Sequence, residues 1–562
     1  MTDFVIIGGG YAGLSCAQEL RRLDDSANIT IISREDYCSR PNLFFRFKFL
    51  TWKDDFIDYH AGLKIRGENS YIEKHKLNLL ENTTVISLDT TNKSIQCKSL
   101  IDDAVVNLRY DKLCIATGGV PKQISYPTLT TSHEADPLIT SMETDAKYID
   151  NIRNNFVVRN VDEVRLLHEK MRLIYTEKCN ATHTSPAINI DSNDMQTDIL
   201  VLGSGALALD VVGHIMDGYT DLNFTQAQHA EKQDWIPERR ECLPRVTILS
   251  RSDVIALPLL QDEHACQMLT DRISGERFPH LNIVRGDVIE SILTCSDGSV
   301  YGVKLTSGRT LYCRVLVQAV GVQSRTEMAQ LCNLNVGKKG GILVDEYFRV
   351  KSINENSTCE HVYAAGDCAE ISSESFVGGL QYLKESQHDA SVAWKNWTSA
   401  REQAIECARC MTKNSQSGML WFNQTSRLFG LYAACLGVYS QIANANIKVK
   451  KSDDRFHKFV GIVQNDVVLL IGALVIGPDV SDYKMGANTL TLLKSNTPIP
   501  CDLFNSIDTW TLAQWTSVNK IVKEVNDGKI EWSKQIVDKI FVEEQTEAPK
   551  KKFVNPLLRK KK

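Results

Sequence analysis

The sequence lacks several features that would place it in particular classes of protein. Its longest apolar run, VVLLIGALVIG from Val467, is shorter than the roughly 20 residues of a membrane span. Its net charge of -5 gives no bulk attraction to nucleic acid. Its 16 cysteines are too sparse for a disulphide framework, and a strand pattern already begins at Phe4. We therefore expect no membrane span, no direct DNA binding, and a reducing compartment: nucleus, cytoplasm or both.

Two segments share a strand, a glycine turn, a helix and a second strand. DFVIIGGGYAGLSCAQEL at 3–20 is followed by ANITIISRED, and TDILVLGSGALALDVVGHI at 197–215 is followed by RVTILSRSD at 245–253. The first turn carries the dinucleotide fingerprint at Gly8, Gly10 and Gly13. The second has Gly203 and Gly205, with Ala208 in the third position. One such turn is weak evidence, but two in this context predict two nucleotide-binding units.

The residues at the end of each second strand bear on which nucleotide is bound. An acidic residue that would hold a ribose hydroxyl is missing from the first unit, where Ser33 stands with Arg34 and Glu35 beyond it. The second unit has Arg251, which favours the 2'-phosphate of NADPH over NADH. Arg251 as a solvated cation at a strand end is an equal alternative.

Four later motifs carry a resemblance to a known family. IATGG at 115–119, VQAVGV at 317–322, GGILVD at 340–345 and YAAGD at 363–367 occur in the order seen in the pyridine nucleotide-disulphide oxidoreductase superfamily. The chain resembles that superfamily over residues 3–410. The resemblance implies FAD in the first unit, NAD(P)H in the second, and Asp367 on the flavin ribitol. The cofactor contacts expected from fingerprint and resemblance are Gly8, Gly9, Gly10, Ala12, Gly13, Ser33, Arg40, Pro41, Thr117, Gly118, Gly203, Gly205, Ala208, Arg251, Gly321, Gly366 and Asp367.

The redox-active cysteine pair of the disulphide reductases has no counterpart in the stretch that follows the first nucleotide-binding unit. DYCSRPNLFFRF at 36–47 contains only Cys38. YCSRPNL is similar to the Tyr-x-Arg-Pro-x-Leu signature of ferredoxin-reductase-like members, with one extra residue and without the lysine that ends it. This makes Arg40 and Pro41 candidate flavin neighbours and Cys38 an ordinary thiol. Cys407 and Cys410 have redox or metal spacing, but a buried helical face is the preferred interpretation, and no metal site is expected.

Part of the chain resembles one branch of the superfamily more closely. Its similar segments are WTSAREQAIECARCM at 397–411, GSGALALD in the second unit, and the segments at 425–439 and 456–477. Members of that branch lack the redox cysteine pair, bind FAD, oxidise NAD(P)H, and are linked to protecting a tRNA ligase complex from oxidation. The YCSRPNL turn, the inserts and the basic tail depart from its usual pattern.

These observations predict an α/β protein with two Rossmann-like dinucleotide-binding domains and a small α+β C-terminal domain. The FAD domain is discontinuous, and the NAD(P) domain is inserted within it. The expected boundaries are 1–155 and 311–412 for the FAD domain, 156–310 for the NAD(P) domain with inserts near 179–196 and 217–244, 413–515 for the C-terminal domain, and 516–562 for a charged tail. We expect residues 456–477 to form a hairpin.

The expected activity is FAD-dependent NAD(P)H oxidation without a redox cysteine pair, with no catalytic side chain assigned. Oxygen, a quinone or a protein partner remain open as acceptors. A redox-gated partner-binding flavoprotein with slow turnover is the alternative, and a thiol/disulphide reductase is a third. The basic tail, with PKKKF at 549–553 and LLRKKK at 557–562, is a nuclear import signal, an RNA-contacting arm or a solvated end.

Overall fold

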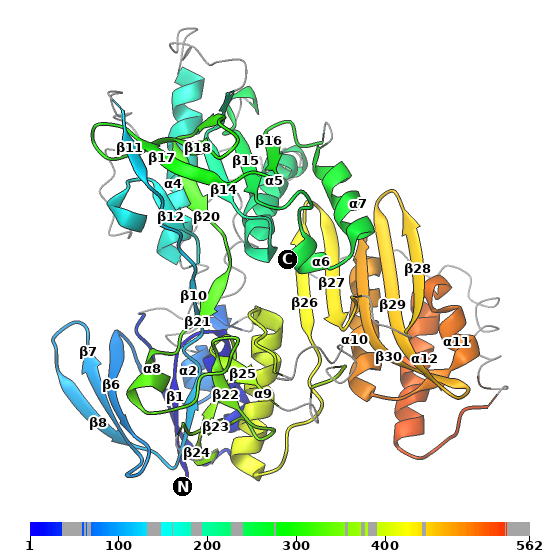
Figure 1. Cartoon of the computed structure of the whole chain (residues 1–562). Helices are drawn as coiled ribbons and strands as arrows, with labels where there is room; N and C mark the ends of the chain where they lie inside the picture. The colour runs from blue at the N-terminus through cyan, green and yellow to red at the C-terminus, as the bar shows by residue number, and fades with distance from the viewer. Residues whose placement is uncertain are drawn as a thin grey trace, which may run out of the picture.

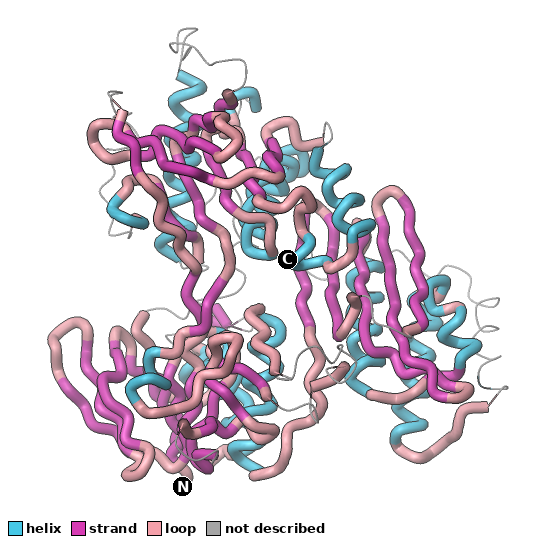
Figure 2. The backbone as a smooth tube through the Cα atoms, viewed as in Figure 1, coloured by secondary structure: helices cyan, strands magenta, loops and turns pink. Residues whose placement is uncertain are grey.

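The computed structural model describes most of the chain as three packed bodies (Figure 1). These are two nucleotide-binding domains and a C-terminal domain, each of which contains both helices and strands (Figure 2). The described residues are 1–35, 59–60, 63–64, 69–131, 148–159, 161–180, 194–225, 240–274, 277–353, 358–372, 377–379, 391–440, 445–533 and 536.

An eight-stranded sheet forms the centre of the first domain. Its spatial order is β25 (Ala369–Ile371), β22 (Ile342–Val344), β23 (Arg349–Lys351), β24 (Thr358–Ala364), β9 (Lys112–Ile115), β1 (Asp3–Ile7), β2 (Asn28–Ile32) and β5 (Asn78–Leu80). The strands from β24 to β5 run parallel, so their carboxyl ends share one edge of the sheet. Because β22 to β25 follow the second domain in sequence, the predicted discontinuous domain is confirmed.

Helices α1 (Tyr11–Leu23) and α9 (Trp397–Lys413) pack against each other in the core of this domain. The predicted helix around Cys407 is therefore present. The smaller elements of the domain are β3 (Tyr59–His60), β4 (Leu63–Lys64), α2 (Tyr71–Lys74), β6 (Thr83–Asp89), β7 (Ser94–Ser99), β8 (Val105–Arg109) and α8 (Glu327–Leu331).

The second domain has a parallel five-stranded sheet. Its order is β12 (Asn155–Val157), β20 (Val315–Gln318), β14 (Ile199–Leu202), β15 (Val246–Ser250) and β16 (Leu281–Arg285). Its helices are α4 (Val161–Asn180), α5 (Ala206–Thr225), α6 (Leu257–Leu260) and α7 (Glu263–Ser274). The sheet extends past the expected boundary at residue 310, because the apolar strand β20 pairs with both β12 and β14.

Besides the small sheets β3–β4 and β6–β7–β8 of the first domain, two further sheets belong to the nucleotide-binding domains. The first has the order β11 (Thr128–Thr130), β17 (Ile289–Thr294), β18 (Val300–Leu305), β19 (Thr310–Tyr312) and β13 (Met195–Gln196). The second is an antiparallel pair, β10 (Gly119–Pro121) with β21 (Val322–Ser324). This pair lies where the chain passes between the two domains in Figure 1. The parallel glycine-turn domains confirm the predicted Rossmann-like α/β fold.

The C-terminal domain is an antiparallel sheet with helices on one face. Its order is β26 (Asn423–Leu428), β27 (Leu431–Gly437), β30 (Val467–Gly477), β29 (Arg455–Gln464) and β28 (Asn446–Ser452), with β31 (Ile499–Pro500) beside β30. The predicted hairpin is β29 and β30, and Asn465 takes a left-handed φ of 57° in its turn. The helices are α10 (Val480–Ser495), α11 (Cys501–Asn505) and α12 (Leu512–Asn526).

Helix α12 continues the C-terminal domain past the expected boundary at residue 515. Trp515, Val518 and Val522 are all buried in the core of that domain. Their helical spacing places them on one face, and Thr511 with Gln514 forms a capping box at the start of the helix. The tail assigned from residue 516 onward therefore begins too early.

The C-terminal domain is bonded to both nucleotide-binding domains. Lys458 Nζ on β29 donates to Asp262 Oδ2 before α7 at 2.8 Å, and Tyr439 Oη donates to the Leu259 carbonyl at 2.7 Å. Toward the first domain, Ser399 Oγ on α9 donates to the Asn423 carbonyl at 3.0 Å. These bonds restrict movement of the two nucleotide-binding domains relative to each other.

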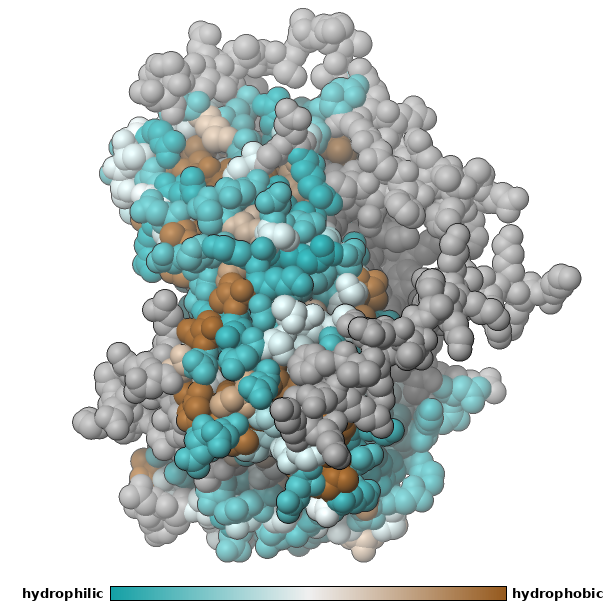
Figure 3. Space-filling model, turned by 90° about the vertical axis from the view of Figure 1, so that its right-hand side faces the viewer, coloured by the Kyte–Doolittle hydropathy of each residue, from teal (hydrophilic) through white to brown (hydrophobic). Residues whose placement is uncertain are grey.

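The surface that Figure 3 shows is mixed, with hydrophobic residues scattered among hydrophilic ones. No helix among the described residues combines the length and hydropathy that a bilayer crossing requires.

Candidate functional site

The first glycine turn joins β1 to α1 and leaves open space in front of its second glycine. Gly8 has a φ of 124°, and a Cβ there would lie 2.1 Å from the Ala116 carbonyl oxygen. A Cβ on Gly13 would lie 1.9 Å from the Gly8 oxygen. By contrast, a Cβ on Gly10 would meet no atom within 4 Å. The turn is thus tight against the protein and open only at Gly10, where α1 begins.

The second glycine turn repeats this arrangement between β14 and α5. Gly203 has a φ of 120°, and its Cβ would lie 2.5 Å from the Ala319 carbonyl oxygen. A Cβ on Gly205 would meet no atom within 4 Å. Ala208 takes the third position and is completely buried. Both helices lack acidic residues in their first turn, so each N-terminus can accept an anion.

A wall beside the first turn is built by the ends of β9, β21 and β24. Thr117 Oγ1 donates to the Arg325 carbonyl at 3.1 Å, and the Arg325 amide donates to the Gly118 carbonyl at 2.9 Å. Ser324 Oγ donates to the Asp367 carbonyl at 2.7 Å. Gly118 has a φ of 73° and open space where its Cβ would be. The predicted Thr117, Gly118 and Asp367 are therefore brought together.

Asp367 follows Gly366, which has to approach helix α1 closely. A Cβ on Gly366 would lie 2.9 Å from the Ala12 Cβ, and the Gly366 amide donates to Gln403 Oε1 at 3.0 Å. The Asp367 carboxylate accepts from Arg159 Nη2 at 3.0 Å. The side chains of Arg159 and Asp367 are 33% and 13% exposed, so this ion pair is only partly screened by water.

The end of β2 contributes a second carboxylate to this wall. Burial raises the pKa of Glu35, while the positive charges of Arg325 and Arg159 oppose that rise. Ser33 itself is buried, and its hydroxyl accepts from the Glu35 amide at 3.3 Å. Ser33 thus organises the turn, and Glu35 lies close enough to both arginines to interact with their charges.

The second nucleotide site has a cationic strand edge. Ser204 Oγ in the glycine turn and Ser250 Oγ at the end of β15 are 2.9 Å apart. The predicted Arg251 follows Ser250 and is exposed. Arg285 is paired in register with Ser250 on the neighbouring strand β16 and is also exposed. No carboxylate occupies the strand-end position itself.

One carboxylate of the second domain titrates near neutral pH. Asp210 lies on α5, and burial raises its pKa to about 7, although a hydrogen bond with Ser426 of β26 opposes that rise. It is located where the second domain meets the C-terminal domain. Gly321, another predicted contact, follows β20 with a φ of 111°.

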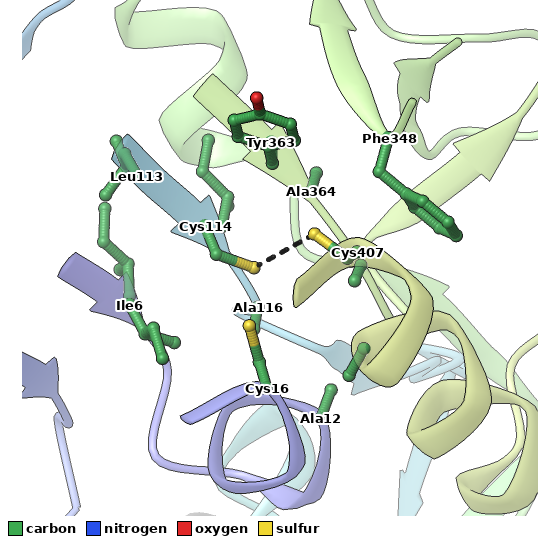
Figure 4. Close-up of a cluster of buried hydrophobic side chains, with 14 of the residues drawn as sticks. Ile6, Ala12, Cys16, Leu113, Cys114, Ala116, Phe348, Tyr363, Ala364 and Cys407 are labelled. Atoms are coloured by element: carbon green, nitrogen blue, oxygen red, sulfur yellow. Dashed lines mark hydrogen bonds between the residues drawn. The ribbon is translucent and has the colours of Figure 1, made fainter. Parts of the chain in front are cut away.

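The cysteines of the predicted CxxC do not form a redox pair with each other. Cys407 and Cys410 are both buried on α9, and the Cys407 sulfur faces Cys114, 3.8 Å away, in Figure 4. Cys16 on α1 completes a group of three thiols. Within the described part of the chain, no group of three or more His, Cys, Asp or Glu side chains is arranged to hold a metal ion.

Sequence patterns identified the turns but missed the charged residues between the domains. Arg159 and Arg325 lie in none of the motifs quoted from the sequence, and Arg159 is separated from Asp367 by 208 positions. Gln403 lies within WTSAREQAIECARCM at 397–411, but nothing in that segment indicated its contact with the Gly366 amide. Cys38, Arg40 and Pro41 lie outside the described residues, as do residues 181–193 and 226–239 of the inserts. Gly9 is buried within the first turn.

The residues present suit one dinucleotide at each turn. Gly10 and Gly205 each leave space at a helix N-terminus, where backbone amides can bind a pyrophosphate. At the first turn, Arg325 Nε is buried and has no hydrogen-bond partner among the described residues, so it can donate to a bound group. A cofactor with negative charge and hydroxyl groups fits the first site, and Arg251 suits an added phosphate at the second.

The family model of the pyridine nucleotide-disulphide oxidoreductases matches residues 2–404. Pyridine nucleotide-disulfide oxidoreductase domain-containing protein 1 of Drosophila melanogaster is 21% identical over 78% of this chain and 83% of its own. The NADH oxidase of Methanocaldococcus jannaschii is 22% identical over 65% and 63% of the two chains. The structure of an NAD-dependent persulfide reductase from A. fulgidus covers 94% of this chain and 85% of its own, with a TM-score of 0.64 at 20% identity.

Proposed function

The chain belongs to the pyridine nucleotide-disulphide oxidoreductase family, and on that premise we propose that it passes electrons from NAD(P)H through FAD to oxygen without a cysteine relay. As a member of that family it is an FAD-dependent NAD(P)H oxidoreductase. The pair of glycine turns carries this assignment, because each is closed by protein on one side and open at a helix N-terminus on the other.

The residues of the two sites have separate roles. Gly10 and the start of α1 would hold the FAD pyrophosphate, and Asp367 would accept a hydrogen bond from the ribityl chain. Gly205 and the start of α5 hold the pyrophosphate of NAD(P)H. When both are bound, the nicotinamide supplies a hydride and the flavin accepts it. The protein would position the two cofactors relative to each other.

The thiols of the described residues support an acceptor other than a disulphide. Cys368, directly after Asp367, donates to the carbonyls of Ile115 and Ala365 at 3.3 and 3.4 Å. Cys16, Cys114 and Cys407 are completely buried in the core of the domain. Neither arrangement presents a dithiol to a substrate. Oxygen is the acceptor favoured by the similarity to an NADH oxidase, with a quinone or a protein as alternatives.

An anaerobic titration of the purified protein with NADH or NADPH tests this proposal. We expect the flavin absorbance to bleach with one equivalent of reduced nucleotide, and to return when oxygen is admitted, with formation of peroxide or water. A flavin that bleaches but recovers only with a quinone or a disulphide would assign a different acceptor. A flavin that consumes a second reducing equivalent would instead indicate a dithiol in the electron path.

A partner-binding role is proposed on the similarity to the Drosophila protein, which extends over most of this chain. From the branch resemblance, the partner would be a tRNA ligase complex, which the flavoprotein protects from oxidation in the nucleus and cytoplasm. Slow turnover would make the nucleotide-bound flavin state a signal for binding. Capture of a ligase complex on immobilised protein should then require NAD(P)H, and equal capture without nucleotide would contradict redox gating.

A further inference from the structure

Three thiols from distant parts of the chain meet in the core of the first domain. Cys16 lies on α1, Cys114 on β9 and Cys407 on α9, and none of the three is exposed to solvent. The sulfurs of Cys114 and Cys407 are 3.8 Å apart, and both thiols lie close enough to Cys16 to lower the pKa of its thiol. Figure 4 shows the Cys114 and Cys407 side chains pointing toward each other between the strand and the helix.

We propose that this cluster is a site of two-electron oxidation, at which peroxide converts the Cys114 and Cys407 thiols into an intramolecular disulphide. A disulphide has a sulfur-sulfur distance of about 2.05 Å, so the two sulfurs have to approach by less than about 2 Å. Rotation about the two Cα–Cβ bonds is the motion that would bring the two sulfurs together.

The chemistry balances with one peroxide molecule. One thiol attacks the peroxide oxygen to form a sulfenic acid and release water or an alcohol, and the second thiol then displaces hydroxide as the disulphide forms. The two sulfurs lose two electrons, the peroxide gains them, and the thiol protons leave in the products.

Neighbouring cysteines lack this arrangement. Cys410 is on the same helix and equally buried, but among the described residues no other sulfur is within hydrogen-bonding distance of it. Burial raises the pKa of Cys410 and of Cys407 alike, so the difference between them is the sulfur neighbour and not the pKa. The Cys407 sulfur has one further neighbour, Met411 Sδ at 3.9 Å, which forms no disulphide.

The Cys114–Cys407 disulphide would connect two elements that lead to the wall beside the first glycine turn. Strand β9 ends next to Thr117, whose hydroxyl donates to the Arg325 carbonyl. Helix α9 carries Gln403, which accepts from the Gly366 amide before Asp367. Oxidation would therefore tie together two of the supports of the first nucleotide site. If oxygen turnover produces peroxide, as the proposed function allows, the oxidant forms in the same protein.

Peptide mapping of the full FAD-loaded chain tests this site with added hydrogen peroxide, independently of turnover. After treatment, free thiols are trapped with N-ethylmaleimide in denaturant, and the protein is digested without reductant. We expect a cross-linked peptide containing Cys114 and Cys407, with loss of label at both and full label at Cys410. Complete labelling of Cys114 and Cys407 would overturn the proposal. Equal oxidation of Cys410 would also overturn the proposal. It would indicate that all these cysteines are merely small apolar core residues, which are oxidised when the protein unfolds.

Two matched variants separate the site from general damage. Cys407→Ala should abolish the cross-link, whereas Cys410→Ala, on the same helix, should retain it. A link from Cys16 to either partner in place of the expected one would overturn the Cys114–Cys407 pairing. If Cys407→Ala does not fold, the wild-type map and the Cys410→Ala map still decide the outcome. Loss of flavin reduction in an untreated sample would contradict the proposed function but leave this test intact.

Discussion

The Arg159 guanidinium of the second domain lies 3.0 Å from the Asp367 carboxylate of the first. Arg159 follows strand β12, and its backbone amide donates to Glu163 Oε2 at 2.6 Å, which holds the start of α4 in place. Its charge also acts on the nearby Glu35. The residue that the family resemblance assigns to the flavin is thus bonded to the other domain, so we expect flavin binding and domain position to be linked.

Arg159→Gln should weaken FAD binding. The substitution removes a partly buried positive charge from the side of the site that receives a cofactor with two phosphates. We expect the Kd for FAD to rise about 5- to 30-fold, equivalent to about 1–2 kcal/mol for a partly exposed charge-assisted contact. Quenching of flavin fluorescence in titrations of the apoprotein measures this.

Arg165→Gln is the matched control for Arg159. Arg165 is on α4, the helix that follows Arg159, and pairs with Asp162 at 3.2 Å, with both side chains more than a third exposed. Its removal should leave the Kd for FAD unchanged. Equal Kd values for the Arg159 variant and the wild type would show that Arg159 is only a structural contact.

Gly10→Val and Gly205→Val should each remove one cofactor and leave the other. No protein atom lies within 4 Å of a Cβ at either position, so both variants should fold, with the new side chain in the space for a pyrophosphate. Gly10→Val should purify without yellow colour. Gly205→Val should retain FAD but show no flavin bleaching with NADH or NADPH. Full FAD content in Gly10→Val would refute the first site.

Gly8→Val gives a contrasting outcome at the same turn. Its φ of 124° is unfavourable for valine, and the Cβ would lie 2.1 Å from the Ala116 oxygen. We expect loss of folded protein rather than selective loss of flavin, measured by the yield of monodisperse soluble protein. Soluble, flavin-free Gly8→Val would show that the turn is less constrained than its geometry indicates.

Arg251→Ala should weaken binding of NADPH more than that of NADH. An arginine at the strand end can pair with the 2'-phosphate, and the charge-assisted contact is worth about 1.5–3 kcal/mol, or about 10- to 150-fold in Kd. Stopped-flow bleaching of the flavin at varied nucleotide concentration gives both Kd values. Arg251→Lys, which keeps the charge, should recover part of the preference. Equal losses for the two nucleotides would leave Arg251 as a solvated cation.

Deletion of residues 549–562 should shift a fluorescent fusion from nucleus to cytoplasm. These residues lie outside the described part of the chain, so the expectation rests on the PKKKF and LLRKKK clusters, which suit an import receptor. FAD content should be unaffected, because the described flavin-site residues all precede this segment. Microscopy and the flavin absorbance ratio measure the two outcomes. An unchanged distribution would leave the tail as a solubilising end.

The sequence predicted features that depend on neighbouring residues and missed those that depend on packing. The glycine turns, the β29–β30 hairpin and helix α9 follow from local periodicity and turn residues. The sequence offered Cys410, three positions away, as the redox or metal partner of Cys407. In the structure the Cys407 sulfur faces Cys114, 293 positions away. The Arg159–Asp367 pair was missed for the same reason, because only the return of the chain to the first sheet brings these residues together. Helix α12 was missed because its buried face is narrow.

Asp210 should make the stability of the fold depend on pH. Its pKa is raised to about 7 by burial, against about 4 in an unfolded chain, so the folded state binds a proton more tightly. Between these values the folded state holds more protons than the unfolded state, and the free energy of unfolding therefore falls as pH rises. The effect is complete above about pH 7, where both states are ionised.

Asp210→Asn removes this titration, so the difference in stability between the variant and the wild type should depend on pH across that window. The thermal unfolding midpoint of the variant minus that of the wild type should be larger at pH 8 than at pH 5. At pH 8 the wild type has to bury a charged carboxylate beside Ser426, whereas asparagine carries no charge. Differential scanning fluorimetry at both pH values gives the difference. Asp271→Asn, at an exposed position on α7, is the control and should show the same difference at both pH values. A pH-independent difference for Asp210→Asn would mean that Asp210 is already ionised in the folded protein at pH 5.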